Sequence, residues 1–281
     1  MRSAAQVSGL EIRSTSRYIT ITIKRSNMLN EVHGGYVKTE THGNITTIEF
    51  FHPAANSMPA KLLEELAHSI HGAGNEADTK VIVLCSGGAS AFCSGASFKE
   101  LSLIKSADEG QKFFSGFAHV INAMRTCPKF IIGRIHGKAV GGGVGLIAAS
   151  DYAIAVEGAD IKLSELSIGI GPFVVGPVIE RRIGFSAFSH LAIDSTMWRN
   201  AEWAKRKGLY AEVHETVNAM DESVSRLTTA LTHTNSQAVR ELKQSFWKGT
   251  ENWDALLSEK AAISGRLVVS DFSRRELSRL M

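Results

Sequence analysis

Three consecutive glycines at positions 141–143 are the residues of this sequence whose types and spacing first suggest chemistry. They follow an apolar strand pattern at 130–132 and a turn at 136–137, and they open an apolar helix. The first amides of a helix have no internal acceptor and lie at the positive end of its dipole, so a glycine-lined helix start can hold negative charge. The pattern therefore predicts a backbone site for an oxygen that carries negative charge.

A second glycine-containing loop, FCSGA at 92–96, has the same setting. It follows an apolar strand pattern at 81–84 and precedes a helical pattern at 97–104. Two such loops at the same end of a parallel sheet can direct two backbone N–H groups at one oxygen, which is how an oxyanion hole is preorganised. Taken together, the two loops predict an oxyanion hole.

The glycines of 141–145 also fit two competing hypotheses. Gly143-x-Gly145-x-x-Ala148, with the acid Glu165 about 20 residues further on, matches a dinucleotide-binding fingerprint. That fingerprint usually follows the first strand of its fold, whereas here a hairpin and a strand–helix unit precede it. Alternatively, the glycines only allow close packing of a helix.

Apolar runs that alternate with amphipathic patterns place both loops in a mostly parallel α/β core. Residues 36–50 form two alternating runs broken at 42–44, which predicts a β-hairpin. From residue 186 onward the pattern is helical. The expected strands of the core lie at 81–84, 130–132 and 153–156, and the expected helices lie at 59–70, 97–104 and 111–125.

Composition excludes several classes of protein. The 281 residues are 44 % hydrophobic, and the net charge of +3 comes from scattered lysines and arginines, so we expect no nucleic-acid partner. No apolar run approaches the roughly 20 residues of a membrane span, so we expect no membrane partner. The three isolated cysteines, Cys85, Cys93 and Cys127, predict neither a disulfide framework nor a metal site, and they favour a reducing, cytoplasmic location.

Five segments, in order, resemble the crotonase superfamily, also called the enoyl-CoA hydratase/isomerase family. The resemblance covers about residues 36–275, and it is the order of the five segments that makes the signal strong. The segments are HPAANSM (52–58), AFCSGASFKE (91–100), IHGKAVGGGVG (135–145) with Asp151, IKLSELSIG (161–169) with Pro172, and AEWAKRKGL (201–209).

The resemblance implies a crotonase-like ββα superhelix, a spiral core within the α/β class, at 36–185, followed by a C-terminal helical region at 186–281. The Ser- and Arg-rich residues 1–35 are then an extension, disordered or non-native, with a transit peptide as the alternative. The resemblance also implies a coenzyme A thioester as substrate, no separate cofactor, a role in fatty acid metabolism, and assembly as a homotrimer or a dimer of trimers.

The resemblance further implies which residues do the chemistry. Backbone amides of Ala96 and Gly142 would hold the thioester oxygen, and Glu165 would be the catalytic carboxylate, with no metal. Binding of the coenzyme A substrate would fall on Ala54, Ser94, Ala96, Lys99 and Gly141.

Three polar side chains near these motifs we interpret as structural. Glu100 and Asp151 lie in the second and third segments, but neither is assigned a step in the reaction. His136, in the turn before the glycines, is expected to be a hydrogen-bonded structural histidine rather than a base.

One departure from the family pattern decides the expected reaction. Hydratases of this family use two glutamates, and the first of them falls on Gly145, which has no side chain, while the second falls on Glu165. Moving a double bond from the 3 to the 2 position needs a single base, so isomerisation of 3-enoyl-CoA to 2-enoyl-CoA is favoured. The bulky Val174 and Val175 replace a usual pair of glycines, which predicts an unusual acyl-chain preference.

Three alternatives stay open. An enoyl-CoA hydratase would need another group in place of the missing glutamate. A dehydratase or decarboxylase acting on a carrier-bound acyl chain would use the same oxyanion hole. From a different class, the chain could be a catalytically silent subunit that binds acyl-CoA.

Overall fold

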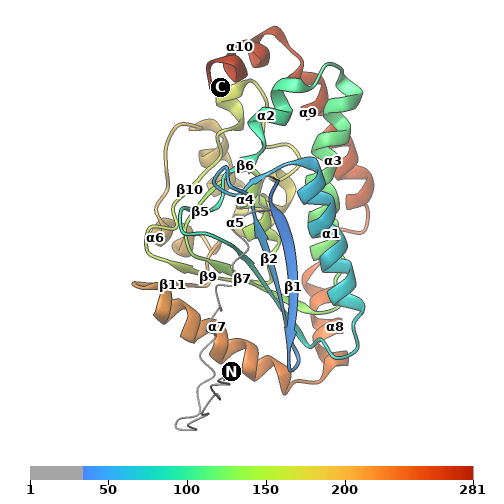
Figure 1. Ribbon diagram of the computed structural model, residues 1–281, viewed down its shortest axis with the longest axis vertical. Coiled ribbons are helices and arrows are strands. Elements are labelled where there is room, and N and C mark those ends of the chain that lie inside the picture. The colour runs from blue at the N-terminus through green and yellow to red at the C-terminus, as the bar shows by residue number, and fades with distance from the viewer. Residues whose placement is uncertain (1–33, 281) are drawn as a thin grey trace, which may run out of the picture. The chain divides into compact units, whose positions relative to one another are not determined.

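The computed structural model describes residues 34–280, so nearly all of the predicted extension at 1–35 lies outside the described residues. Its largest sheet has six strands in the order β1-β2-β4-β7-β9-β11 (Figure 1). β1 and β2 form the predicted antiparallel hairpin, and the other pairs in this sheet are parallel. The strands are β1 (Tyr36–His42), β2 (Ile45–Phe51), β4 (Val81–Ser86), β7 (Phe130–Ile135), β9 (Tyr152–Val156) and β11 (Glu212–His214).

Helices cover this sheet, as the apolar strand patterns predict. All six residues of β4 are buried, which is typical of a parallel strand covered on both faces. The predicted apolar face of the first helix is buried in α1, at Leu62, Leu63, Leu66 and Ile70. The helices of the core are α1 (Ala60–Asn75), α2 (Phe98–Leu103), α3 (Ala107–Thr126), α4 (Gly142–Ala149) and the 3-10 helix η1 (Glu165–Ile168).

Two small parallel sheets hold the glycine loops. One has the order β10-β8-β5, and the other pairs β3 with β6. β8 leads into α4, and β5 and β6 contain most of the second loop, so pairing of these short strands fixes both loops. Their bounds are β3 (Ser57–Met58), β5 (Ala91–Cys93), β6 (Gly95–Ala96), β8 (Lys138–Val140) and β10 (Ile161–Lys162).

The C-terminal part is mainly helical, as predicted. The predicted domain boundary at 185 lies inside α5, next to Gly184, whose φ of +78° interrupts the helix. The short strand β11 follows the fifth segment of the resemblance, which ends at Leu209. The helices are α5 (Gly176–Ile193), α6 (Ala201–Arg206), α7 (Val217–Thr232), α8 (Ser236–Phe246), α9 (Trp253–Val268) and α10 (Asp271–Arg279).

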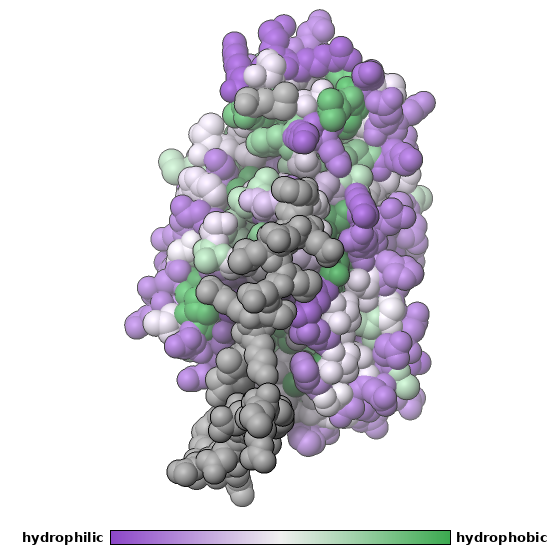
Figure 2. All heavy atoms as spheres, in the orientation of Figure 1, coloured by the Kyte–Doolittle hydropathy of each residue, from purple (hydrophilic) through white to green (hydrophobic). Residues whose placement is uncertain are grey.

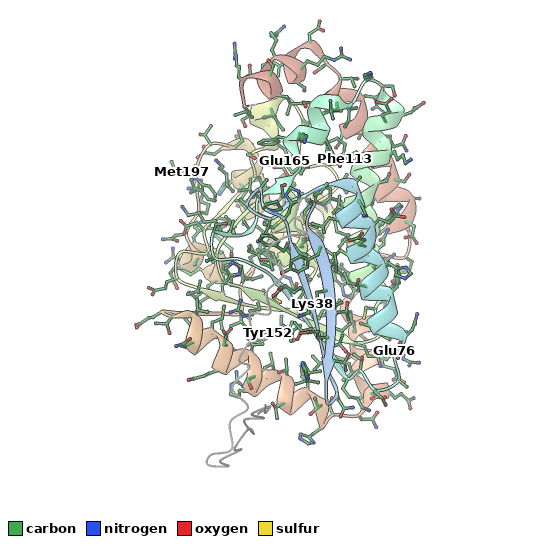
Figure 3. The ribbon with its side chains drawn as sticks, in the orientation of Figure 1. Lys38, Glu76, Phe113, Tyr152, Glu165 and Met197 are labelled. Atoms are coloured by element: carbon green, nitrogen blue, oxygen red, sulfur yellow. The ribbon has the colours of Figure 1, made fainter. Side chains whose placement is uncertain are left out.

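Helix α9 packs along α3 (Figure 1), and two glycines allow the close approach. A Cβ on Gly265 would lie 2.4 Å from the backbone nitrogen of Gln111, and a Cβ on Gly110 would lie 2.7 Å from the Cα of Gly265. The face in Figure 2 carries mostly hydrophilic side chains, with hydrophobic ones in small groups. Figure 3 shows Glu165 near the Phe113 end of α3, away from Tyr152 on β9.

Candidate active site

The first glycine loop presents a free helix start. Gly141 precedes α4 with φ +53° and ψ −114°, a conformation that only glycine adopts readily. Its N–H donates to the carbonyl of Lys162 at 2.9 Å, which ties the loop to β10. Gly142 is the first residue of α4, so its N–H has no acceptor within the helix. Gly142 lines a pocket, which is the position that an oxyanion donor requires.

The second loop lies against the first. The Ser97 N–H donates to the Met58 carbonyl at 3.3 Å. Because successive amides of a strand point to opposite sides, the preceding Ala96 N–H points away from β3. A Cβ on Gly95 would lie 3.5 Å from the Gly142 nitrogen, so the two loops are in close contact. Ala96 and Gly142, the two residues that the resemblance assigns to the oxyanion hole, line the same pocket.

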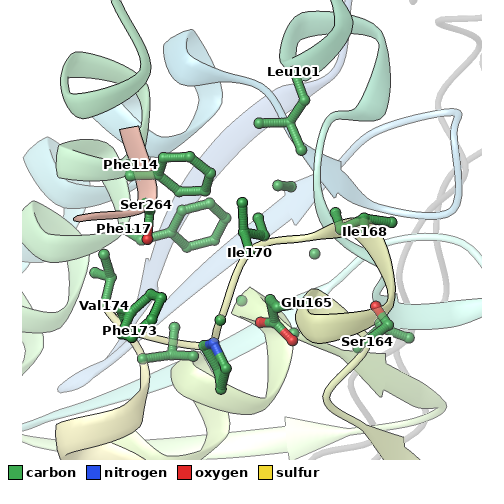
Figure 4. Close-up of a pocket in the computed structure, with 18 of the residues that line it drawn as sticks. Leu101, Phe114, Phe117, Ser164, Glu165, Ile168, Ile170, Phe173, Val174 and Ser264 are labelled. Atoms are coloured by element: carbon green, nitrogen blue, oxygen red, sulfur yellow. The ribbon is translucent and has the colours of Figure 1, made fainter. Parts of the chain in front are cut away.

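The pocket is apolar apart from a few groups (Figure 4). Its walls come from the two glycine loops, α2, α3, the segment from 164 to 175, and one residue of α9. No lysine, arginine or histidine is among the described residues that line it. The lining residues are Ser94, Gly95, Ala96, Phe98, Leu101, Phe114, Phe117, Val140, Gly141, Gly142, Ser164, Glu165, Ile168, Ile170, Gly171, Pro172, Phe173, Val174, Val175 and Ser264.

Glu165 is the single carboxylate among these lining residues. It is the first residue of η1, and its carboxylate lies against Gly141, where a Cβ would come within 2.8 Å of Oε1. Oε2 is buried and has no hydrogen-bond partner among the described residues. Burial without a compensating cation raises the pKa of Glu165 to about 7. Such a carboxyl group can accept and return a proton near neutral pH.

Val175 occupies the space beside Gly145. A Cβ on Gly145 would lie 2.5 Å from Cγ1 of Val175 and 2.8 Å from its Cβ. Val175 is itself buried, 4 % exposed. A carboxylate therefore has no room at position 145 unless Val175 moves.

The predicted coenzyme A residues fall in two places. Ser94 and Gly141 line the pocket together with Ala96. Ala54 is exposed, and its carbonyl accepts a hydrogen bond from the Ser94 hydroxyl at 3.3 Å, so it lies beside the pocket. Lys99 is exposed on α2 and does not line the pocket.

Comparison with known proteins places the chain in a family. The sequence model described as enoyl-CoA hydratase/isomerase matches residues 40–276. The chain belongs to this family. The match covers most of the chain, and it includes both glycine loops and Glu165.

Relatives and solved structures agree with this membership. A probable enoyl-CoA hydratase of Bacillus subtilis is 30 % identical over 132 residues, which are 47 % of this chain and 51 % of that protein, so the match spans about half of that relative. The peroxisomal Delta(3,5)-Delta(2,4)-dienoyl-CoA isomerase of Arabidopsis thaliana is 26 % identical over 229 residues, 76 % of each chain. The crystal structure of enoyl-CoA hydratase from Bacillus halodurans has the same fold, with a TM-score of 0.81 and 24 % identity over 87 % of this chain and 99 % of that one.

The glycines of 141–145 divide between two roles in this family member. A Cβ on Gly143 would lie 2.6 Å from the Cys93 carbonyl oxygen, and Gly145 faces Val175, so these two glycines serve packing. Gly141 and Gly142 line the pocket instead. Gly143 and Gly145, two residues of the dinucleotide fingerprint, are thus covered by side-chain and backbone contacts.

Two other candidate groups take no part in the pocket. Cys93 is fully buried, and burial raises the pKa of its thiol to about 12, which disfavours the nucleophilic thiolate form. His136 does not line the pocket, and neither ring nitrogen has a hydrogen-bond partner among residues 34–280. The prediction of a hydrogen-bonded histidine is therefore wrong. Within the same residues there is no cluster of metal-ligating side chains, and no helix is long and apolar enough to span a membrane.

Sequence reasoning missed the aromatic wall and the contribution of α9. Phe117 stands over Gly142, where a Cβ would come within 2.1 Å of its ring. The apolar face of the helix predicted at 111–125 was a usable signal for Phe117 and its neighbour Phe114. Ser264 also lines the pocket, and nothing in the local sequence marks it.

Proposed function

We propose that this chain isomerises 3-enoyl-CoA to 2-enoyl-CoA with Glu165 as its only acid–base group. The proposal depends on two residues that both line the pocket, Glu165 and Val175. Oε2 of Glu165 has no hydrogen-bond partner among residues 34–280, while Val175 fills the space beside Gly145 where a second carboxylate would need to be. Hydration of a conjugated double bond uses two carboxylates in the hydratases that this sequence resembles, whereas isomerisation uses one.

The proposed reaction is a proton transfer within the substrate. The ionised Glu165 takes a proton from the carbon next to the thioester carbonyl, and the electron pair passes to the carbonyl oxygen. The amides of Ala96 and Gly142 donate hydrogen bonds to that oxygen and stabilise the dienolate. The protonated Glu165 then returns the proton to the fourth carbon, which leaves the double bond between the second and third carbons.

One base and two oxyanion donors can together supply a large rate enhancement. A positioned base contributes roughly 10²- to 10⁴-fold, and loss of one oxyanion donor costs roughly 10²- to 10³-fold. The raised pKa of Glu165 suits a group that must both take and return a proton near neutral pH. Ser94, which lines the pocket, and the exposed Ala54 and Lys99 are the proposed contacts of the coenzyme A moiety.

The test is a product assay in heavy water with 3-enoyl-CoA and, separately, 2-enoyl-CoA. We expect 2-enoyl-CoA from the first substrate and no 3-hydroxyacyl-CoA from either. Glu165→Gln should reduce the isomerisation rate by roughly 10²- to 10⁴-fold while acyl-CoA binding is kept.

Glu100→Gln is the matched control. Glu100 is also a glutamate near the glycine loops, but its Oε2 accepts the N–H of Ala60 at 2.8 Å at the start of α1. We expect this variant to isomerise at the wild-type rate. A 3-hydroxy product would contradict the single-base proposal, and acyl-CoA binding without turnover would indicate a silent binding subunit.

A further inference from the structure

Ser264 places a hydroxyl group in the apolar wall of the pocket. The residue is 2 % exposed and belongs to α9. Its Oγ makes no hydrogen bond to another described side chain or backbone group, and the residue lines the pocket with Phe114 and Phe117. Figure 4 shows Ser264 on the side of these phenylalanines, away from Glu165 and Ser164. The hydroxyl is therefore on the phenylalanine side of the pocket rather than beside Glu165, and we take that side to receive the acyl tail.

The position of Ser264 is fixed by the packing of its helix. The next residue, Gly265, lies so close to α3 that a Cβ there would meet the Gln111 nitrogen at 2.4 Å and the Ala107 carbonyl oxygen at 2.6 Å. α9 cannot rotate or retreat without breaking this contact. The hydroxyl of Ser264 is thus held at the pocket wall.

The Ser264 hydroxyl faces the pocket, so a hydrocarbon tail that fills the pocket would displace water from it without offering a hydrogen bond in return. A hydroxyl left unpaired against a hydrocarbon tail weakens the binding of that tail. An oxygen on the acyl tail would accept its hydrogen bond and avoid this weakening. An anionic tail would find no positive partner, since no lysine, arginine or histidine is among the described lining residues.

We propose that Ser264 is a specificity-determining residue that selects acyl groups with a neutral hydrogen-bonding oxygen in the tail, such as a keto group. This inference rests on the proposed function, because it takes the pocket to be the acyl site. It adds the substrate class: an uncharged, oxygen-bearing acyl thioester rather than a plain hydrocarbon or a dicarboxylic one.

The test measures binding, so it does not depend on turnover. Calorimetry would compare hexanoyl-CoA, 4-oxohexanoyl-CoA and 5-oxohexanoyl-CoA, which have the same length and no double bond to move. We expect the wild-type protein to bind at least one oxo compound about tenfold more tightly than hexanoyl-CoA, which corresponds to about 1.4 kcal/mol. Ser264→Ala should bring the ratio to within about twofold.

Ser115→Ala is the matched control, because Ser115 is on the neighbouring α3 and its hydroxyl donates to the Gln111 carbonyl at 2.8 Å. This variant should keep the wild-type preference. Equal or weaker binding of both oxo compounds by the wild-type protein would overturn the inference, as would an unchanged ratio in Ser264→Ala. A preference for the oxo compounds without any isomerisation would leave the role of Ser264 standing and refute only the proposed reaction.

Discussion

Asp151 and Glu165 are two buried carboxylates of one core, with opposite surroundings. Oδ2 of Asp151 lies 2.8 Å from Nζ of Lys243 and accepts the N–H of Ile131 at 2.7 Å. Oε2 of Glu165 has no partner among the described residues, and the pocket around it offers no cation. Asp151 therefore forms an ion pair that joins α8 to the sheet, while Glu165 has no such partner among the described residues. The difference teaches that burial alone does not make a carboxylate catalytic.

Removing the partner of Asp151 should have the largest effect on stability. Lys243→Met leaves a buried carboxylate unpaired, and breaking such a pair costs about 3–5 kcal/mol. Chemical unfolding of the variant should show this loss in the free energy of unfolding. The exposed Lys248→Met is the control and should change the free energy of unfolding by less than about 0.5 kcal/mol. A loss below about 1 kcal/mol in Lys243→Met would show that the pair contributes little.

Removing the charge of Glu165 should stabilise the fold at alkaline pH. Its pKa rises from an ordinary value of 4.5 to about 7 in the folded chain, so the folded state holds the proton more tightly. Stability from this group is present below about pH 4.5 and is lost as the pH rises through about 7. At about pH 8, Glu165→Gln should therefore be more stable than the wild-type protein, by on the order of 1–3 kcal/mol.

The control for this stability effect is the same pair of proteins at about pH 4, where the advantage should vanish because the wild-type carboxyl is protonated in both states. A Gln variant that is less stable than the wild-type protein at about pH 8 would mean that Glu165 has a stabilising partner. Glu165 and Asp151 would then both be carboxylates with a stabilising partner.

His136 should give the opposite dependence on pH, with a smaller effect. Burial lowers the pKa of this histidine from 6.5 to about 4, and Arg134 acts in the same direction. Its contribution to stability is full above about pH 6.5 and is lost as the pH falls toward about 4. His136→Gln should reduce the acid sensitivity of unfolding between these values by about 1 kcal/mol. The exposed His233→Gln is the reference variant. If His136→Gln has the same acid sensitivity as the wild-type protein, His136 does not have the lowered pKa described above.

Much of the site could be predicted from the sequence because each glycine loop is a short, continuous segment of the chain. Each glycine loop follows a strand and opens a helix, so the meeting of Ala96 and Gly142 follows from the sheet being parallel. The missing side chain at Gly145 is likewise visible in the sequence. The sequence does not show why a side chain at position 145 has no room. Val175 fills that space, and it comes close to Gly145 only through the packing of the folded chain.

The pocket wall could not be predicted for a related reason. Ser264 is about 100 residues beyond Glu165 in the sequence, and it reaches the pocket through the Gly110–Gly265 contact between α3 and α9. Neither glycine belongs to a motif. The unpaired state of His136 also depends on neighbours from other elements, so the sequence alone led to the wrong expectation of a hydrogen bond.

The most direct test of the central claim is the pH dependence of kcat/KM for a 3-enoyl-CoA. If the unpaired Glu165 is the base, its ionised form is the active one, and kcat/KM should fall about tenfold for each pH unit below an apparent pKa near 7. A profile that is flat from about pH 5 to about pH 9 would contradict this claim, because the base would then be fully ionised throughout this range and could not be a carboxyl group with a pKa near 7.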